Sequence, residues 1–262
     1  MGPLPTVHAY AITFSGDMPV LAMSKILCHN GHSPCHCCLI TGEKLSHNYY
    51  PVLTPPRVSG CRSSARWDAK NLPLHNHDLH LQQLTGMKYA NNNTQRKALA
   101  IKYGVHRLSM LLQIPSFSFP ISFPYDIMHL FFENVCPLLQ DHWTGSHKFK
   151  DIEPSDPGYQ LAPHIWEMIG RKTAEAYRTI PSGFVGAMPD ISNSKYKAKY
   201  MSFWVQFLGP LLLRNRFPKS KYYRHFCDLV QIIKTCLQFT ISHTTLQHLQ
   251  ESIVTWVQQY EK

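Results

Sequence analysis

The sequence predicts an α+β protein that is predominantly helical and carries a small remnant of mixed sheet near its N-terminus. A run of β-forming residues opens the chain, an irregular stretch rich in cysteine and histidine follows, and helical spacing dominates the second half. Of the 262 residues, 44% are hydrophobic and 16% are charged, which is typical of a packed core rather than of a disordered chain. We divide the chain into segments 1–27, 28–113, 114–150 and 151–262.

The first predicted element is a buried strand over residues 7–14, which read VHAYAITF. The strand ends at the turn-forming sequence Ser15-Gly16-Asp17, which places the Asp17 carboxylate at its C-terminal end. Pro19 suits the first turn of a helix, because its φ angle is already fixed near the helical value. The order of strand, acid and helix is one way of presenting a carboxylate at the edge of a sheet.

The cysteines and histidines between residues 28 and 38 form the main candidate for a metal site. A C-x-x-C pair places two thiolates within reach of one metal ion, and a tetrahedral zinc site needs two more ligands. The predicted zinc ligands are Cys28, His32, Cys35 and Cys38. The competing ligands are His29, His36 and Cys37 nearby, and His75, His77 and His80 in the later sequence LPLHNHDLH. The alternative is an irregular loop whose cysteines bind no metal.

A bound metal would explain why residues 28–78 show little regular periodicity. Four of the eight cysteines lie in one tight cluster, whereas a secreted disulfide framework spreads its cysteines along the chain. The N-terminal residues lack a basic stretch followed by an apolar one, so we expect no secretory signal. No apolar run reaches about 18 residues, so we expect no membrane span.

The middle of the chain leads into a helix that begins with an acid. Helical spacing returns over residues 79–113, where Asn91 to Thr94 mark a helix start or a loop between two helices. Residues 114–125 (IPSFSFPISFPY) predict an extended, partly buried connector, because a residue before proline is pushed away from helix. Asp126 then opens the mostly buried helix DIMHLFFENVCPLL, where capping and the helix dipole favour an acid.

Asp17 and Asp126 are the candidate catalytic acids. Two-metal phosphoryl transfer needs carboxylates that hold two divalent ions, and carboxylate oxygens suit magnesium or manganese. His129 and Glu133 follow Asp126 at spacings that place all three on one helix face, so Glu133 is an alternative third acid. The alternative interpretation makes Asp17 a turn residue and Asp126 a helix cap, with two ordinary helix residues beyond it.

The C-terminal half is predicted to be helical and basic. Its segments with helical spacing are 162–178, 197–214, 220–240 and 244–260. The formal net charge of +10 favours a polyanionic partner, most commonly nucleic acid. Basic residues mix with tyrosines that can stack on unpaired bases in RNRFPKSKYYRHF. The predicted nucleic-acid contacts are Arg214, Arg216, Lys219, Lys221 and Arg224. The alternative is a solvated helix face with buried tyrosines.

Several of these segments resemble CACTA (En/Spm-like) DNA transposases, and especially the fungal branch of that family. The family's Gly-Asp-x-Pro motif and the Cys/His cluster after it resemble GDMPVLAMSKILCHNGHSPCHCCLITG, and its Leu-Pro-Leu stretch resembles NLPLHNH. Its Asp-x-Met-His motif, with a nearby Asn, resembles SFPYDIMHLFFENV. The region beyond that motif resembles IGRKTAEAYRTIPSGF, SFWVQFLGPLLLRNRF and KYYRHFCDLV, so the resemblance covers nearly the whole chain.

The resemblance implies an RNase H-like nuclease core, interrupted by the Cys/His-rich insertion, that cleaves and transfers DNA strands at transposon ends. Asp17 matches the family's second acid, and Asp126 is the best match for the third, with His129 beside it. The cluster from Cys28 to Cys38 matches a zinc site. The resemblance also implies structural zinc, magnesium or manganese for catalysis, a nuclear location, and DNA as partner. Self-association or a full-length transposase is the expected protein partner.

One departure from the family pattern bears on activity. The family's first acid lies upstream of the Gly-Asp motif, but the sixteen residues before Asp17 include no acid. We therefore expect a truncated protein with an incomplete core, inactive alone, because a metal pair that lacks one carboxylate is not held. One alternative is a non-enzymatic, zinc-dependent module that binds DNA or protein. Another is an unrelated small zinc enzyme with Glu43 or Glu133 as its base.

Overall fold

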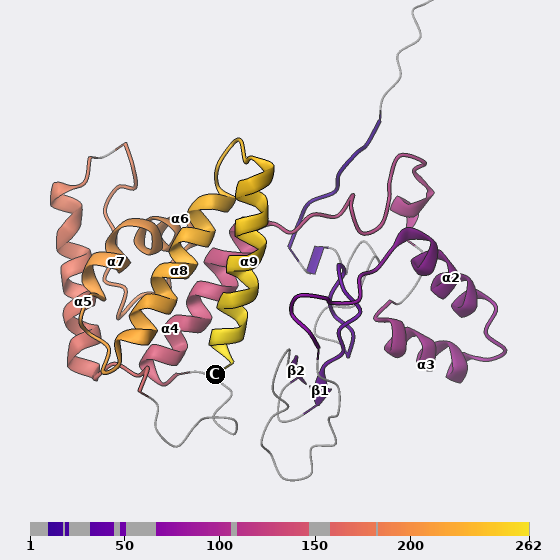
Figure 1. The fold of residues 1–262 in the computed structure, drawn as a ribbon, viewed down its shortest axis with the longest axis horizontal. Helices are drawn as coiled ribbons and strands as arrows, with labels where there is room; N and C mark the ends of the chain where they lie inside the picture. Colours follow the sequence, from indigo (N-terminus) through magenta and orange to yellow (C-terminus); the bar gives the residue numbers. More distant parts are fainter. Residues whose placement is uncertain are drawn as a thin grey trace, which may run out of the picture. The chain divides into compact units, whose positions relative to one another are not determined.

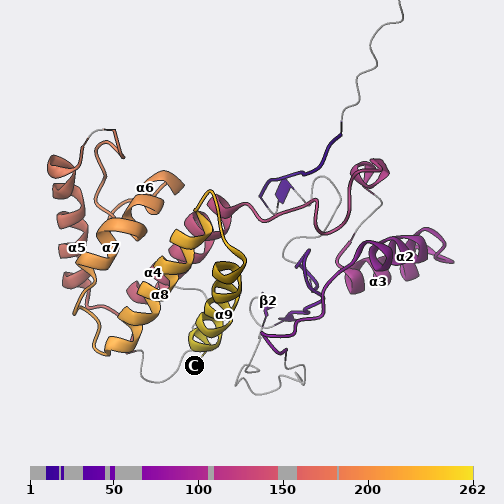
Figure 2. The same ribbon diagram turned by 45° about the horizontal axis from the view of Figure 1, so that its top comes forward.

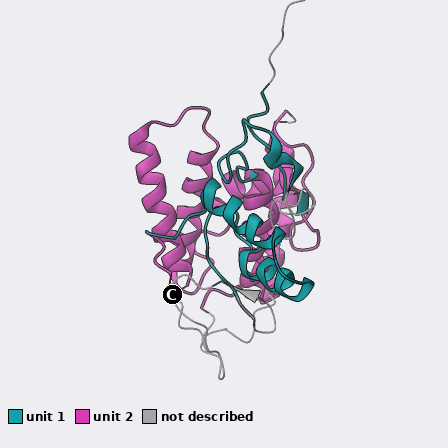
Figure 3. Ribbon diagram, turned by 90° about the vertical axis from the view of Figure 1, so that its right-hand side faces the viewer, with its two compact units in different colours: residues 1–51, 71–126 teal, residues 52–70, 127–262 magenta. Residues whose placement is uncertain are grey.

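The computed structural model describes residues 10–17, 19–20, 32–44, 48–50, 67–105, 109–146, 158–181 and 183–261. These residues are predominantly helical, as the sequence predicts, and they divide into two compact units (Figure 3). Unit 1 comprises residues 1–51 and 71–126, and unit 2 comprises residues 52–70 and 127–262. The boundary after residue 126 falls inside the segment 114–150. No described helix is both long enough and apolar enough to cross a membrane.

The elements that the structure describes in unit 1 are short (Figure 1). Its elements are β1 (Glu43–Lys44), β2 (Asn48–Tyr49), α2 (His77–Lys88), α3 (Asn93–Tyr103) and the 3₁₀ turn η1 (Met110–Gln113). The two strands pair antiparallel. The Asn92 side chain caps α3 by accepting a hydrogen bond from the Gln95 N–H at 2.8 Å, so the helix start predicted at Asn91 to Thr94 is confirmed.

The strand predicted over residues 7–14 is wrong for the part of it that the structure describes. Residues 10–17 have no strand, and residues 7–9 lie outside the described residues. The Phe14 N–H donates to the Ser122 carbonyl at 2.8 Å, and the Ser116 hydroxyl donates to the Ala11 carbonyl. A strand needs a continuous ladder with its neighbour. Here the neighbour is the proline-rich connector, which cannot supply one because proline has no N–H donor.

The larger sheet of an RNase H-like core is not seen among the described residues. Their ladders are the two-residue pair β1–β2 and a single antiparallel bridge between Cys38 and Leu74. The helix predicted from Pro19 to Leu27 lies mostly outside the described part of the chain, and the two described residues at its start, 19 and 20, are helical. The predicted helical character is therefore confirmed, and the predicted RNase H-like sheet is not observed among the described residues.

The apolar core of unit 1 is small and centres on the connector. Phe117, Phe119 and Phe123 are buried and pack with Leu84 and Met87 of α2. The rings of Phe117 and Phe123 meet edge to face, with centroids 5.5 Å apart. The partial burial predicted for residues 114–125 is confirmed, and their phenylalanines supply half of the six buried apolar side chains of this cluster. The extended conformation predicted there is wrong: the segment folds into successive turns, in which the Ser122 N–H donates to the Ser118 carbonyl at 2.8 Å and the Phe123 N–H to the Pro120 carbonyl at 2.9 Å.

Unit 2 is a bundle of helices (Figures 1 and 2). Its elements are η2 (Met128–Val135), α4 (Cys136–Thr144), α5 (Pro163–Ala176), η4 (Tyr177–Thr179), α6 (Ala198–Phe203), η5 (Trp204–Leu208), α7 (Gly209–Leu212), α8 (Ser220–Cys236) and α9 (His243–Tyr260). The four helical segments predicted in this region are confirmed, although α8 ends four residues before the predicted residue 240. In both views α8 and α9 lie side by side.

Two turns of unit 2, η2 and η5, have the wider π-helical geometry. In each case a proline, Pro137 or Pro210, lies two residues beyond the π segment. Proline has no N–H, and its ring clashes with the carbonyl four residues earlier in a regular α-helix. A wider turn ahead of the proline relieves that clash. Hydrophobic spacing predicts these helices but does not distinguish the π turns within them.

Aromatic side chains dominate the core of unit 2. The cluster holds 23 buried apolar residues, with tryptophans at its centre. The rings of Trp143 and Phe226 meet at 88° with centroids 5.3 Å apart, and those of Trp166 and Trp204 meet at 71° with centroids 6.1 Å apart. The indole N–H of Trp204 donates to the Thr173 hydroxyl at 3.0 Å, so this buried polar group has its partner.

Candidate metal centre

The two cysteines of the C-x-x-C pair are in contact in unit 1. The Sγ atoms of Cys35 and Cys38 lie 3.2 Å apart, and the Cys38 backbone N–H donates to Cys35 Sγ at 3.3 Å. Cys38 is 7% exposed, whereas Cys35 is half-buried. Two soft sulfur ligands therefore converge on one position, which is the arrangement that a C-x-x-C spacing favours.

The loop that carries these cysteines is seated on the C-terminal end of α3. The Ser33 hydroxyl donates to the Lys102 carbonyl at 3.1 Å. Gly104 ends α3 in the left-handed conformation, with φ of 68°, and a side chain at this position would collide with the Ser33 carbonyl. The αL conformation and the close approach both require glycine here.

A second attachment joins the cysteine loop to the Leu-Pro-Leu stretch. The His75 N–H donates to the Cys37 carbonyl at 2.9 Å, and the Leu39 N–H donates to the Pro73 carbonyl at 2.8 Å. Leu74 forms the bridge to Cys38. The structure thus brings the histidine-rich sequence LPLHNH beside the thiol pair. The sequence identified the cysteine cluster and these histidines as candidates, but their backbone pairing depends on the fold.

Tyr125 is a further group beside the thiols. Its Oη lies 3.1 Å from Cys35 Sγ, although 90 positions separate the two residues in the chain. The His36 ring packs against the Tyr125 ring with centroids 4.3 Å apart. Sequence reasoning missed Tyr125, because a search for metal ligands by cysteine and histidine spacing does not consider a phenol. Its position directly before Asp126 was the available signal.

The contacts of the two thiols push their pKa values in opposite directions. The hydrogen bond from the Cys38 thiol, aided by Tyr125, lowers the pKa of Cys35 to about 5, against the opposing effect of burial. The same hydrogen bond and burial raise the pKa of Cys38. Cys35 is therefore a thiolate at neutral pH, which is the form that binds metals.

Unit 1 contains three buried histidines with ring nitrogens that lack a hydrogen-bond partner, and two of them, His36 and His75, lie close enough to Cys35 for its charge to affect their pKa values. His36, His75 and His80 are 0%, 6% and 1% exposed. Among the described residues, both ring nitrogens of His36 and His80, and Nδ1 of His75, have no hydrogen-bond partner of good geometry. Burial lowers the pKa of all three, that of His80 to about 4, so they are neutral at pH 7. A neutral imidazole with a free nitrogen is the ligand form of histidine.

The predicted ligand set is only partly within the described chain. Cys35 and Cys38 are brought together, and Cys28 lies outside the described residues. His32 is exposed, and its carbonyl accepts a hydrogen bond from the Gly42 N–H at 2.7 Å. His77 uses Nδ1 to accept from the Phe119 N–H at 3.1 Å. Among the described residues, no group of three or more histidine, cysteine or acidic side chains is arranged to hold a metal ion.

The candidate catalytic residues are divided between the two units. Asp17 and Asp126 belong to unit 1, whereas His129 and Glu133 belong to unit 2. The Asp17 carboxylate accepts a hydrogen bond from the Val20 N–H at 2.8 Å, which is a local turn contact. His129 Nε2 lies 3.6 Å from Glu133 Oε2 on η2, so these two do share a helix face. Glu43, the alternative base, lies on β1.

The predicted nucleic-acid contacts are exposed and close together in the chain. They occupy the turn after α7 and the first turns of α8, and comprise Arg214, Arg216, Lys219, Lys221 and Arg224. Asn215 adopts a positive φ of 58° at this turn. Lys221 Nζ lies 4.8 Å from the centroid of the Tyr222 ring. The arrangement presents several cations to solvent, as a phosphate backbone requires.

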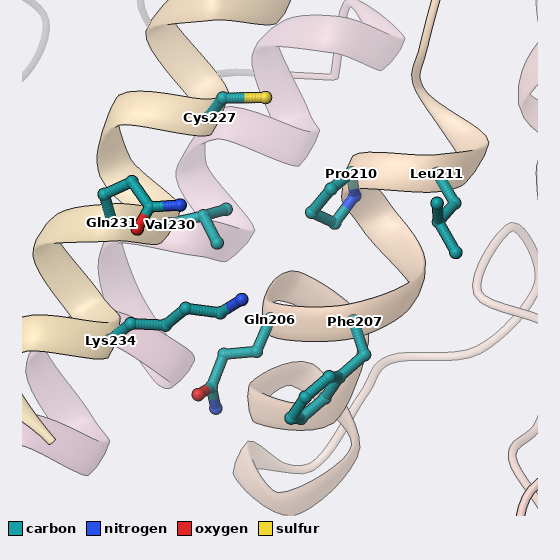
Figure 4. A pocket seen from close by; sticks show the side chains of 8 residues that line it. All are labelled: Gln206, Phe207, Pro210, Leu211, Cys227, Val230, Gln231 and Lys234. Carbon is teal, nitrogen blue, oxygen red and sulfur yellow. The ribbon is translucent and has the colours of Figure 1, made fainter.

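A groove of about 310 Å³ lies in unit 2 between η5–α7 and α8. Figure 4 shows Phe207 and Leu211 on one wall, Val230 and Cys227 on the other, and the Lys234 side chain reaching between them. Lys234 Nζ lies 5.6 Å from the centroid of the Phe207 ring, so the cation covers this exposed aromatic ring. Apart from two glutamines and one lysine, the groove has apolar or sulfur-bearing walls.

The chain was compared with known proteins: no protein-family model matches it, and neither a curated protein nor a solved structure is significantly similar to it.

Proposed function

We propose that this chain is a transposase-derived protein of the CACTA type, whose unit 1 is organised by a structural zinc ion and whose basic unit 2 binds DNA. The observation that carries the proposal is the contact of 3.2 Å between the Cys35 and Cys38 thiols. Two thiols at this separation in a loop-rich unit match the ligand chemistry of structural zinc. The ordered motifs along the chain support the transposase origin.

A bound zinc ion would provide a partner for the polar groups of the site that lack one. It would take up both sulfurs and deprotonate the Cys38 thiol, whose pKa is raised in the free protein. The two remaining ligands are Cys28 and His32, as the sequence predicts, or include His75, whose Nδ1 is buried without a partner. In the second case the ion would cross-link the cysteine loop to the Leu-Pro-Leu stretch.

The catalytic part of the proposal is limited to a remnant of an RNase H-like site. Hydrogen bonding between Phe14 and Ser122 joins the segment before Asp17 to the connector before Asp126, which supports a common location for the two acids. Magnesium or manganese needs a fuller set of carboxylates than these two. We therefore propose that this chain binds DNA in the nucleus and does not cleave it alone.

Metal content tests the zinc proposal directly. We expect the purified chain to hold about one zinc ion, measured by mass spectrometry, as a single tetrahedral site requires. The double variant Cys35→Ser/Cys38→Ser should lose it, and Cys227→Ser in unit 2 should keep it. Loss in His32→Ala or in His75→Ala identifies which histidine is a ligand. A folded parent chain without zinc would contradict the proposal.

Salt dependence tests the DNA part. Neutralising Arg214 and Arg216 together (Arg214→Gln/Arg216→Gln) should weaken binding to duplex DNA and reduce the slope of log K against log salt by about 2, since each phosphate contact contributes about 0.9. The control Arg171→Gln/Arg178→Gln removes the same charge from exposed positions on α5 and η4. Equal losses in both variants would show that binding reflects only the net charge.

A further inference from the structure

The thiol pair of Cys35 and Cys38 lies at a separation from which a disulfide can form with little movement. Its two Sγ atoms are 3.2 Å apart, whereas the sulfurs of a disulfide are about 2.05 Å apart. The sulfurs therefore need to approach by only about 1 Å, which rotation of the two side chains can supply. Both residues belong to unit 1, so this geometry does not depend on how the two units are placed.

The backbone around the pair holds the two sulfurs together before any oxidation. The Cys38 N–H donates to Cys35 Sγ at 3.3 Å, which fixes the turn between the two residues. Inside that turn, the Cys37 carbonyl accepts from the His75 N–H at 2.9 Å. Two groups that are already held side by side react more readily than two groups that must first meet. The fold therefore favours reaction of these two thiols with each other.

The hydrogen bonds assign a different role to each sulfur. The Cys38 thiol donates to Cys35 Sγ, so Cys38 retains its proton and Cys35 is the acceptor. Cys35 is half-buried, whereas Cys38 is 7% exposed, so a small oxidant reaches Cys35 more easily. Cys35 is therefore the sulfur that attacks the oxidant, and Cys38 is the thiol that attacks the oxidised product.

Cys37 lies between the two sulfurs in the chain but is poorly placed to pair with Cys38. The Cα atoms of consecutive residues are about 3.8 Å apart, below the range of about 4.4–6.8 Å that disulfides usually span. The other free cysteines of the described chain belong to unit 2 and are Cys136, Cys227 and Cys236. Of the possible partners for Cys38 in the described part of unit 1, the spacing favours Cys35.

We propose that Cys35 and Cys38 are an oxidative modification site, at which hydrogen peroxide forms a disulfide and thereby removes both sulfurs from a bound zinc ion. Cys35 Sγ attacks one peroxide oxygen, the O–O bond breaks, and a sulfenic acid and one water molecule result. Cys38 Sγ then attacks the Cys35 sulfur, the S–O bond breaks, and the hydroxyl group leaves as water with the Cys38 proton. The two thiols lose two hydrogen atoms, and one peroxide is reduced to two water molecules.

The disulfide changes the stability of unit 1 through the metal. Zinc binds cysteine as the thiolate, so a disulfide no longer supplies these two ligands and the ion is released. The disulfide closes a loop of only a few residues, so it constrains the unfolded chain little and does not replace a metal ion as a cross-link. Release of zinc rests on the proposed zinc site, whereas formation of the disulfide does not.

Peptide mapping by mass spectrometry, after hydrogen peroxide treatment of the reduced, full chain, tests the disulfide. We expect the peptide with Cys35 and Cys38 to contain an internal disulfide in the parent chain and in Cys37→Ser, and dithiothreitol to reverse it. Cys38→Ser should instead keep a Cys35 sulfenic acid that dimedone traps, because the second thiol is gone. The parent chain and Cys37→Ser decide the question if Cys38→Ser fails to fold.

Two results would overturn the modification site. One is a folded parent chain in which Cys35 stays reduced or pairs with a cysteine elsewhere in the chain. The other is loss of the disulfide in a folded Cys37→Ser variant, which would identify Cys37 as the partner. The matched control Cys227→Ser removes a half-buried thiol of unit 2 and should leave the disulfide unchanged.

Zinc release in the same titration separates this proposal from that of the zinc site. A chromogenic chelator should detect one zinc ion for each disulfide formed, since the pair supplies two ligands of one tetrahedral ion. Zinc that stays bound after complete disulfide formation overturns the release step. A folded chain without zinc before oxidation contradicts the zinc proposal, and the peptide mapping still decides whether Cys35 and Cys38 are the modification site.

Discussion

Units 1 and 2 are stabilised in different ways. Unit 2 buries 23 apolar residues around three tryptophans, and the buried Trp204 indole has its hydrogen-bond partner. Among the described residues, unit 1 has a cluster of six buried apolar side chains, and it also contains two thiols in contact and three buried histidines with ring nitrogens that lack a hydrogen-bond partner. Burying a polar group without a partner costs free energy. From this comparison of the described residues we expect unit 1 to depend on an additional stabilising interaction more than unit 2 does.

Removal of the metal should produce the largest difference in stability between the two units. We expect a chelator to unfold unit 1 and leave unit 2 folded, because structural zinc contributes on the order of 10 kcal/mol in small metal-binding domains. Hydrogen exchange measured by mass spectrometry should show loss of protection in α2 and α3, with α5 and α8 still protected. Tryptophan fluorescence reports independently on unit 2, since all five tryptophans belong to it. Equal loss of protection in both units would contradict the comparison.

A substitution in the core of unit 2 should destabilise that unit and leave unit 1 unaffected. Trp204→Ala should lower the free energy of unfolding of unit 2 by about 3–5 kcal/mol, because it empties space between Trp166 and Phe226 and leaves the Thr173 hydroxyl without its partner. Urea unfolding followed by circular dichroism measures this loss. Zinc content, which depends on unit 1, should not change. Zinc loss in a variant that retains its helices would show that the units are coupled.

A smaller effect concerns His80 in unit 1, which stacks on Phe119 with ring centroids 4.0 Å apart. Burial lowers its pKa to about 4. Between about pH 6.5 and pH 4, His80 is therefore protonated in the unfolded chain and neutral in the folded chain. This histidine therefore lowers the stability of unit 1 as the pH falls from about 6.5 to about 4, by at most about 3 kcal/mol. His80→Phe should reduce the loss of unit 1 protection between pH 7 and pH 5, measured by hydrogen exchange corrected for intrinsic rates. An unchanged pH dependence in this variant would argue against a buried, neutral His80.

The sequence predicted the helices of unit 2 well, because burial on one face of a helix leaves a periodic pattern in the residues themselves. It also indicated a helix start or an interhelical loop at Asn91 to Thr94, and the structure places the cap of α3 there, at Asn92. It failed at residues 10–14, since β-forming residues make a strand only where a neighbour offers a ladder, and the connector does not. It also missed Tyr125, which reaches Cys35 only through the folded path of the chain.

The sequence by itself determined the helical class, the C-x-x-C pair and the excess of basic over acidic residues. Only the tertiary structure decided which histidines are buried beside the thiols and how the candidate acids are divided between the units. The physical reason is the range of the interactions. Periodicity, capping and ligand spacing act over a few residues, whereas burial and unsatisfied hydrogen bonds depend on segments brought together from distant parts of the chain.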